Sequence, residues 1–176
     1  MNNFKCLIIL SLLFHFSCLN YNSSNLKELS ELEYKISLDK KKISHLKTFQ
    51  TKKNLQLAKN NFLLLESMNL DSISFELIYF KYKDYLSCVN NIYSYVEIIE
   101  ILNEELKINE VQLSNLIKEH QSSRRPRPDL NSYVENEKKL IESTSKKINE
   151  LHINLKHEAL RFDSLNLSIE KIINAE

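Results

Sequence analysis

The sequence contains no glycine, and this absence constrains the fold more than any other feature. The chain has 176 residues and only two prolines, Pro126 and Pro128, so it lacks the residues that supply positive-φ turns, bulges and strand corners. We therefore expect an all-α fold. The Rossmann fingerprint and the P-loop need glycines so that the backbone can approach phosphate, and neither can be built from this sequence.

Heptad spacing predicts a long middle helix over residues 72–121. With Phe75 as position a, the a series is Phe75, Tyr82, Val89, Val96, Asn103, Glu110 and Ile117. The d series is Ile78, Tyr85, Ile92, Ile99, Leu106, Leu113 and His120. Most members of both series are apolar or aromatic, as expected for a buried seam.

Two further helices are predicted on either side of this one. Apolar residues seven apart, from Val134 to Ile169, indicate a helix over residues 130–174. A weaker pattern predicts a first helix over residues 25–66, with a bend near residues 50–54. The short connections at 67–71 and 122–129 make neighbouring helices antiparallel. We expect one domain, an elongated up-down-up bundle of three long helices with coiled-coil-like heptad packing.

Several apolar residues of the middle helix lie off its a/d seam and require a second packing partner. These residues are Leu77, Phe80, Tyr95, Ile98, Ile101, Ile108 and Val111. The third helix of the same chain can cover them, and so can a second copy in a homo-oligomer. The sequence alone leaves both alternatives open.

The first residues have the pattern of an export signal. A single lysine at position 5 precedes the apolar run 6–16, whose eleven residues suit a signal-peptide core, whereas a membrane-spanning helix needs about 20 apolar residues. Ser17 and Cys18 follow directly, and then a polar stretch. We therefore expect export, with residues 1–17 as signal peptide.

Ser17 and Cys18 resemble the end of a bacterial lipobox, a small residue followed by a cysteine. The third position before the cysteine, usually aliphatic in this family, is His15 here. The low-glycine, lysine- and asparagine-rich helical body is similar to small spirochaete surface lipoproteins. The resemblance implies lipidation of Cys18, with residues 18–24 as tether and 25–176 as the bundle. It also implies an outer-membrane anchor, on the surface or periplasmic side, in preference to the inner membrane.

The charge of the processed chain argues against nonspecific nucleic-acid binding. Signal removal takes away Lys5 and no acidic residue, which leaves 23 of the 24 basic residues against 23 acidic ones. The net charge is then zero, so the electrostatic basis of phosphate-backbone binding is missing. We expect no nucleic-acid partner.

Two surface features could contact a partner. Arg124, Arg125 and Arg127 lie on a proline-stiffened turn and could pair with phosphate or carboxylate, although such a turn can also be only a solvated connection. Tyr79 and Phe80 belong to an aromatic cluster that core packing largely explains. Phe80, beside Lys81, is the member that we expect to be exposed, and Tyr79 and Phe80 form a candidate aromatic interface.

No residue pattern indicates catalysis. Helical di-metal centres use Glu-x-x-His, and no histidine here has glutamate three residues before it. Asn103, Glu110 and His120 are better explained as polar residues that fix helix register. Cys88 lies within a predicted helix and is best explained as a small packing residue. We therefore predict no enzyme activity, no cofactor and no metal.

These observations lead to two functional hypotheses. The first is an exported, lipid-anchored protein that presents a helical bundle to an unidentified protein, either a host factor or an envelope component. The alternative is a structural coiled-coil envelope protein that acts as an oligomeric spacer.

Overall fold

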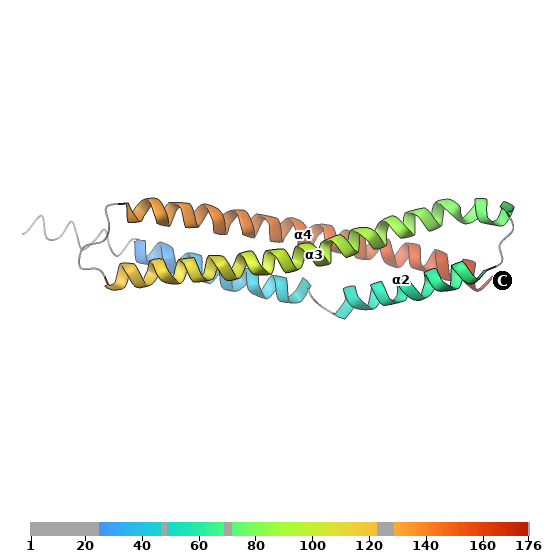
Figure 1. Ribbon diagram of the computed structural model, residues 1–176, viewed down its shortest axis with the longest axis horizontal. Helices are drawn as coiled ribbons and strands as arrows, with labels where there is room; N and C mark the ends of the chain where they lie inside the picture. The colour runs from blue at the N-terminus through green and yellow to red at the C-terminus, as the bar shows by residue number, and fades with distance from the viewer. Residues whose placement is uncertain (1–24, 47–48, 69–71, 123–128, 176) are drawn as a thin grey trace, which may run out of the picture. The chain divides into compact units, whose positions relative to one another are not determined.

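The computed structural model describes residues 25–46, 49–68, 72–122 and 129–175, except for the side chains of residues 49–50, 72–75 and 77. This part of the chain is helical and contains no strand. Residues 25–46 form the first helix, followed by α2 (Phe49–Ser67), α3 (Ser72–Ser122) and α4 (Leu130–Ile173) (Figure 1). The predicted all-α fold, with long helices packed against each other, is confirmed.

The helix bounds agree closely with the sequence patterns. α3 and α4 each end within one residue of the predicted positions. The first predicted helix, 25–66, corresponds to residues 25–46 and α2, and residues 47–48 lie outside the described part. Residues 50–54, where a bend was expected, belong to the uninterrupted helix α2.

Asp129 occupies the N-cap position of α4. The backbone carbonyl of Asp129 accepts hydrogen bonds from the backbone N–H groups of Ser132 at 2.9 Å and Tyr133 at 3.3 Å. A residue whose carbonyl accepts the first helical bonds is the N-cap.

The chain divides into two compact units. Unit 1 holds the described residues up to Asp39 together with Glu105–Ser145. Unit 2 holds Lys40–Glu104 and the described residues from Lys146 onward. Each unit has its own buried core, so the two are described one at a time.

In unit 1, segments of the first helix, α3 and α4 pack around aliphatic residues. Asn25 donates a hydrogen bond to Asn131 at 2.8 Å, Lys138 pairs with Glu28 at 2.7 Å, and Ser145 donates to Asp39. Because residue numbers rise together in these pairs, the first helix and α4 run parallel. The core consists of Leu29, Leu32, Ile36, Leu106, Leu113, Leu116, Leu130, Val134 and Ile141.

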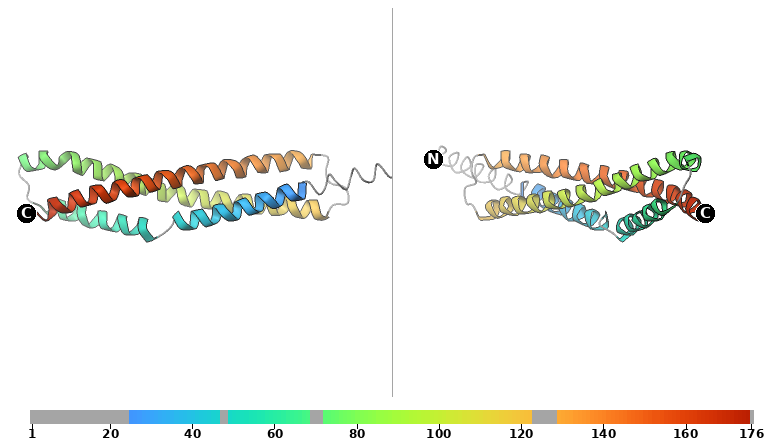
Figure 2. Two further views of the ribbon diagram at one scale, coloured as in Figure 1. Left: turned by 180° about the vertical axis from the view of Figure 1, so that it is seen from behind. Right: turned by 45° about the vertical axis from the view of Figure 1, so that its right-hand side comes forward.

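In unit 2, α2, the first part of α3 and the last part of α4 pack together, as the two views of Figure 2 show. The ring of Phe62 on α2 lies 5.7 Å from that of Tyr82 and 5.3 Å from that of Tyr85 on α3. The Tyr85 ring also lies 5.5 Å from that of Phe162 on α4. The core consists of Ala58, Leu65, Tyr85, Cys88, Val89, Ile92, Phe162 and Ile169.

The buried seam of α3 differs by one position from the predicted a series. The d series from Tyr85 to His120 is buried, as expected. Its companions in the second half of the helix are Leu102, Asn109 and Leu116, whereas Glu110 is exposed and Asn103 is half-buried. An α-helix with 3.6 residues per turn drifts by about 20° per heptad from a strict 3.5-residue repeat, which is enough to exchange neighbouring positions over several heptads.

Candidate functional site

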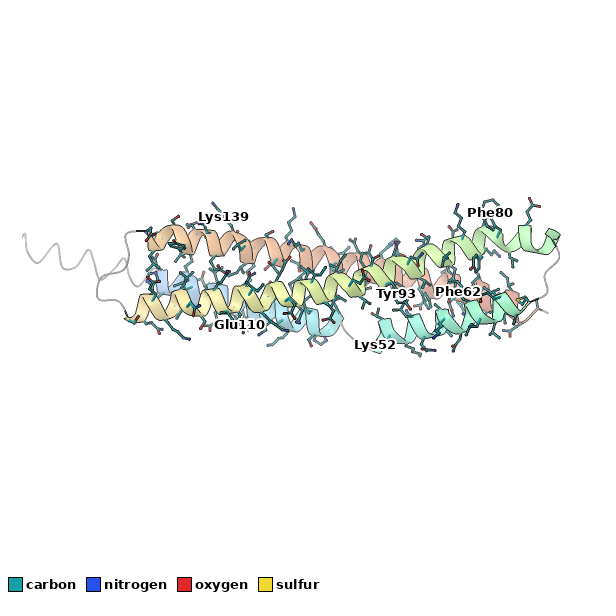
Figure 3. The ribbon with its side chains drawn as sticks, in the orientation of Figure 1. Lys52, Phe62, Phe80, Tyr93, Glu110 and Lys139 are labelled. Carbon is teal, nitrogen blue, oxygen red and sulfur yellow. The ribbon has the colours of Figure 1, made fainter. Side chains whose placement is uncertain are left out.

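The predicted site residues fall into two groups. Cys18, Arg124, Arg125 and Arg127 lie outside the described residues, so their roles stay predictions. Tyr79 and Phe80 are described and are 42% and 71% exposed, with their ring centroids 5.8 Å apart. Phe80 projects from the outer side of α3 (Figure 3). These two exposed rings stay a candidate interface.

Most off-seam apolar residues of α3 are not covered by the rest of the chain. In unit 2, Ile98 is 38% exposed and Ile101 is 59% exposed. In unit 1, Ile108 and Val111 are also exposed. The idea that the third helix buries them is therefore wrong for these residues, because α4 packs on the opposite, d-containing face. Tyr95 is half-buried, and the side chain of Leu77 lies outside the described part.

An open groove of about 270 Å³ lies between α2 and α3 in unit 2. Its apolar lining comes from Leu55, Phe62, Leu63, Val89 and Tyr93. Two charged residues of α2, Lys59 and Glu66, also line it. The labelled side chains of Phe62 and Tyr93 lie between the two helices in Figure 3. An apolar groove with charges on one wall has the features of a helix-binding site.

The outer side of α4 in unit 2 carries a row of aliphatic residues seven positions apart. Ile153, Leu160 and Leu167 are 66%, 64% and 60% exposed. Seven-residue spacing places them on one helix face, because seven residues make about two turns. The row was not predicted from the sequence, because the Val134 to Ile169 series indicates only the buried side of this helix.

A buried polar network crosses the three helices of unit 2. The amide of Asn61 donates to Asn166 Oδ1 at 2.8 Å, and the hydroxyl of Tyr85 donates to the same oxygen at 2.8 Å. The amide nitrogen of Asn166 donates to Glu170 at 2.8 Å. Burial is the main cause that raises the pKa of Tyr85. The hydroxyl thus stays protonated and acts as a donor, and the network fixes the helix register.

Cys88 is a packing residue, as predicted. Its side chain is fully buried, and its Sγ donates to the backbone carbonyl of Glu158 at 3.5 Å. Burial is the main cause that raises the pKa of Cys88 to about 12, and the Glu158 side chain adds to the rise. Because the thiolate is the nucleophilic form, the Cys88 side chain has no reactive character near neutral pH.

Polar side chains also enter the buried seam of α4, at Glu137, Thr144 and Glu158. These three residues continue the series of Leu130 and Leu151 at seven-residue spacing. Thr144 accepts a hydrogen bond from Asn109 at 3.2 Å, and Glu158 accepts one from Asn91 at 3.1 Å. Their seven-residue spacing is visible in the sequence, but apolar periodicity does not detect polar residues.

Glu137 is the least satisfied carboxyl in unit 1. It is 5% exposed, and its Oε1 has no hydrogen-bond donor among the described residues. Burial raises the pKa of Glu137 above its ordinary value. The folded state therefore favours the protonated carboxyl.

Replacing Glu137 with glutamine should remove one step from the pH dependence of stability. The pKa of Glu137 is higher in the folded state than in the unfolded state, where it is about 4.3. The stability that the protonated carboxyl contributes is therefore present in full below the unfolded-state pKa, and it is lost as the pH rises through the folded-state pKa. Urea unfolding of both proteins at a series of pH values measures the difference. Parallel stability curves for the protein and its Glu137→Gln variant would contradict this assignment.

Neither a metal site nor a membrane-spanning helix is found in the described part of the chain. No three His, Cys, Asp or Glu side chains gather there as a metal site. His120 is buried at the end of the α3 seam, and burial is the main cause that lowers its pKa. None of the described helices combines the length and apolar content needed to cross a membrane.

Comparisons with known proteins give no match: no family model, no curated protein and no solved structure is similar to this chain.

Proposed function

We propose that the protein is an exported lipoprotein, anchored through Cys18 to the outer membrane, that presents its helical bundle for protein–protein interaction without catalysing a reaction. The observation that carries the interaction role is the apolar surface of unit 2. The groove between α2 and α3 and the α4 row Ile153, Leu160 and Leu167 both lie open. Exposed apolar patches and grooves of this kind often mark interaction sites on protein surfaces.

The anchoring part of the proposal is supported by the sequence. An apolar run of eleven residues precedes Ser17-Cys18, and a polar stretch connects Cys18 to the first helix, which is described from residue 25 onward. A lipid on Cys18 would anchor the bundle to the outer membrane, either on the cell surface or on the periplasmic side. The arginines at 124, 125 and 127 are candidates for contact with anionic head groups or an acidic partner.

A non-enzymatic role is supported by the state of the groups that could react. Cys88 is buried with its pKa raised to about 12, and Tyr85 is held in the buried network. Several described polar side chains of the interior, among them Asn61 with Asn166 and Asn109 with Thr144, hydrogen-bond to one another across helices. These hydrogen bonds hold the helices in register.

Replacing Cys18 with serine should release the protein from the membrane fraction. Serine keeps the size of the side chain but cannot form the thioether that carries the lipid. Cell fractionation and immunoblotting measure the distribution, and the original protein should remain in the membrane pellet after a high-salt wash. Cys6→Ser is the matched control and should leave the distribution unchanged, since Cys6 belongs to the removed signal. Membrane retention of Cys18→Ser would refute lipid anchoring at this residue.

The alternative role as an oligomeric spacer is favoured by one observation, the strict seven-residue spacing of Ile153, Leu160 and Leu167 on the outside of α4. Exposed apolar residues at this spacing are typical of a helix that packs against a helix of another chain. This role shares the anchor but has a second copy as the partner.

A further inference from the structure

Unit 2 exposes both a groove and a ridge, and they lie on different helices. The groove runs between α2 and α3, with Phe62 and Leu63 near its middle. The ridge is the α4 row, with Leu160 at its centre and Ile153 and Leu167 at its ends. Helices pack when the side-chain ridge of one enters the groove formed by others. A ridge such as the α4 row can therefore pack into a groove such as the one between α2 and α3.

The charges beside both features match in spacing. Lys59 and Glu66 lie seven residues apart on α2 and both line the groove. On α4, exposed Lys156 and Asp163 are also seven residues apart, and each follows a member of the row by three positions. Seven residues correspond to about 10.5 Å along a helix, so both pairs can be in register at once.

The order of the charges selects one orientation. If α4 of a second copy lies antiparallel to α2, Lys59 faces Asp163 and Glu66 faces Lys156. Leu160 then reaches the groove at the level of Phe62 and Leu63, midway between the two charge pairs. In the parallel orientation lysine would face lysine and Glu66 would face Asp163, which is repulsive.

We propose that the chain assembles with itself by inserting the α4 row of one copy, antiparallel to α2, into the α2–α3 groove of the next. The two surfaces belong to different faces of one unit, so the interface is heterologous. Such an interface leaves a free groove at one end and a free row at the other, and it propagates into rings or open arrays. The product is a series of copies rather than a closed dimer.

This inference rests on the proposed interaction role of unit 2, and it names a second copy as the partner. It does not depend on lipid anchoring. Disulfide trapping of the full chain in intact cells tests it, with membrane fractionation of the same samples. Membrane attachment without trapping would overturn the assembly alone, and trapping in the soluble fraction would overturn the anchor alone.

The trapping experiment uses Leu63→Cys in the groove and Leu160→Cys on the row. Chains that carry one substitution each, expressed together and mildly oxidised, should give a disulfide-linked dimer. A chain that carries both should give a ladder of higher multiples on a non-reducing gel. Ile101→Cys replaces Leu63→Cys in the matched control, because Ile101 is 59% exposed but does not line the groove. This control should give no dimer above background.

Two results would overturn the proposal. A strong dimer from Leu160→Cys alone would show that two α4 rows meet face to face. The absence of any dimer beyond the Ile101→Cys control would show that the row and groove do not meet. The natural cysteines are common to all samples, so they contribute the same background.

Charge reversal gives an independent readout of orientation. Lys59→Glu or Asp163→Lys should each lower the trapped fraction about threefold to fivefold, the size expected when one exposed ion pair becomes repulsive. Both reversals in one chain should restore it. Lys53→Glu, an exposed α2 lysine outside the groove, is the matched control. Failure of the double reversal to restore trapping would contradict the antiparallel arrangement.

Discussion

Replacing Ile99 with alanine should lower the free energy of unfolding by about 2 to 5 kcal/mol, whereas the same replacement at Ile101 should change it by less than about 0.5 kcal/mol. Both residues are isoleucines on α3 within unit 2. Ile99 is 2% exposed and Ile101 is 59% exposed. Removing the outer side-chain carbons of Ile99 leaves a cavity in the buried seam. Removing those of Ile101 leaves no cavity, because these carbons are exposed to solvent.

Urea denaturation followed by circular dichroism measures both changes. Because the two substitutions remove the same atoms from the same helix, helix propensity cancels between them, and the comparison isolates burial. The experiment should be run at low protein concentration, so that contacts between copies contribute little. Equal losses at the two positions would mean that a surface other than the observed seam covers Ile101.

Replacing Asn166 with alanine should lower the free energy of unfolding by about 2 to 6 kcal/mol, because it leaves two buried donors without their acceptor at about 1 to 3 kcal/mol each. These donors are the Tyr85 hydroxyl and the Asn61 amide, each 2.8 Å from Asn166 Oδ1. Asn154→Ala on the same helix is the matched control. Asn154 is exposed, so its replacement should have little effect on stability.

A second substitution separates the network from simple packing. Tyr85→Phe in the Asn166→Ala background removes one stranded donor, and it should cost less there than in the original protein. Denaturation of the two single variants and the double variant gives this coupling free energy. Additive losses would indicate that Tyr85 and Asn166 do not act as one network.

The long helices of this protein were predictable because their determinants are local. The glycine-free sequence and the apolar series from Tyr85 to Leu113 and from Val134 to Ile169 indicated α3 and α4 with nearly correct bounds. Apolar periodicity reports directly which side of a helix is buried. A helix of this kind carries its pattern whatever its neighbours are.

The parts that were missed depend on neighbours far away in the sequence. Asn109, rather than Glu110, is buried in the seam of α3. Which of these two neighbours is buried depends on how the apolar stripe of α3 turns relative to the helix that packs against it. Burial of Glu137 and Glu158 could not be seen, because acidic residues are almost never expected in an interior without their cross-helix partners. The exposed row of α4 becomes apparent only once its inner seam is assigned.

The candidate interaction surfaces were predictable only in part. Exposure of Phe80 followed from its position beside Lys81, off the main seam. The groove between α2 and α3 could not be derived, because it is formed by Leu63 and Tyr93 on separate helices whose register is set by packing. A groove is a property of the assembled fold rather than of either sequence segment.

The mass of the mature N-terminal peptide, taken from the protein purified from its own cells, tests the proposed lipoprotein identity most directly. The proposal predicts a peptide that begins at Cys18 and carries the added mass of a diacylglyceryl group. It also predicts that no peptide from residues 1–17 remains attached. An unmodified Cys18 in a peptide that still contains Ser17 would contradict the lipid anchor.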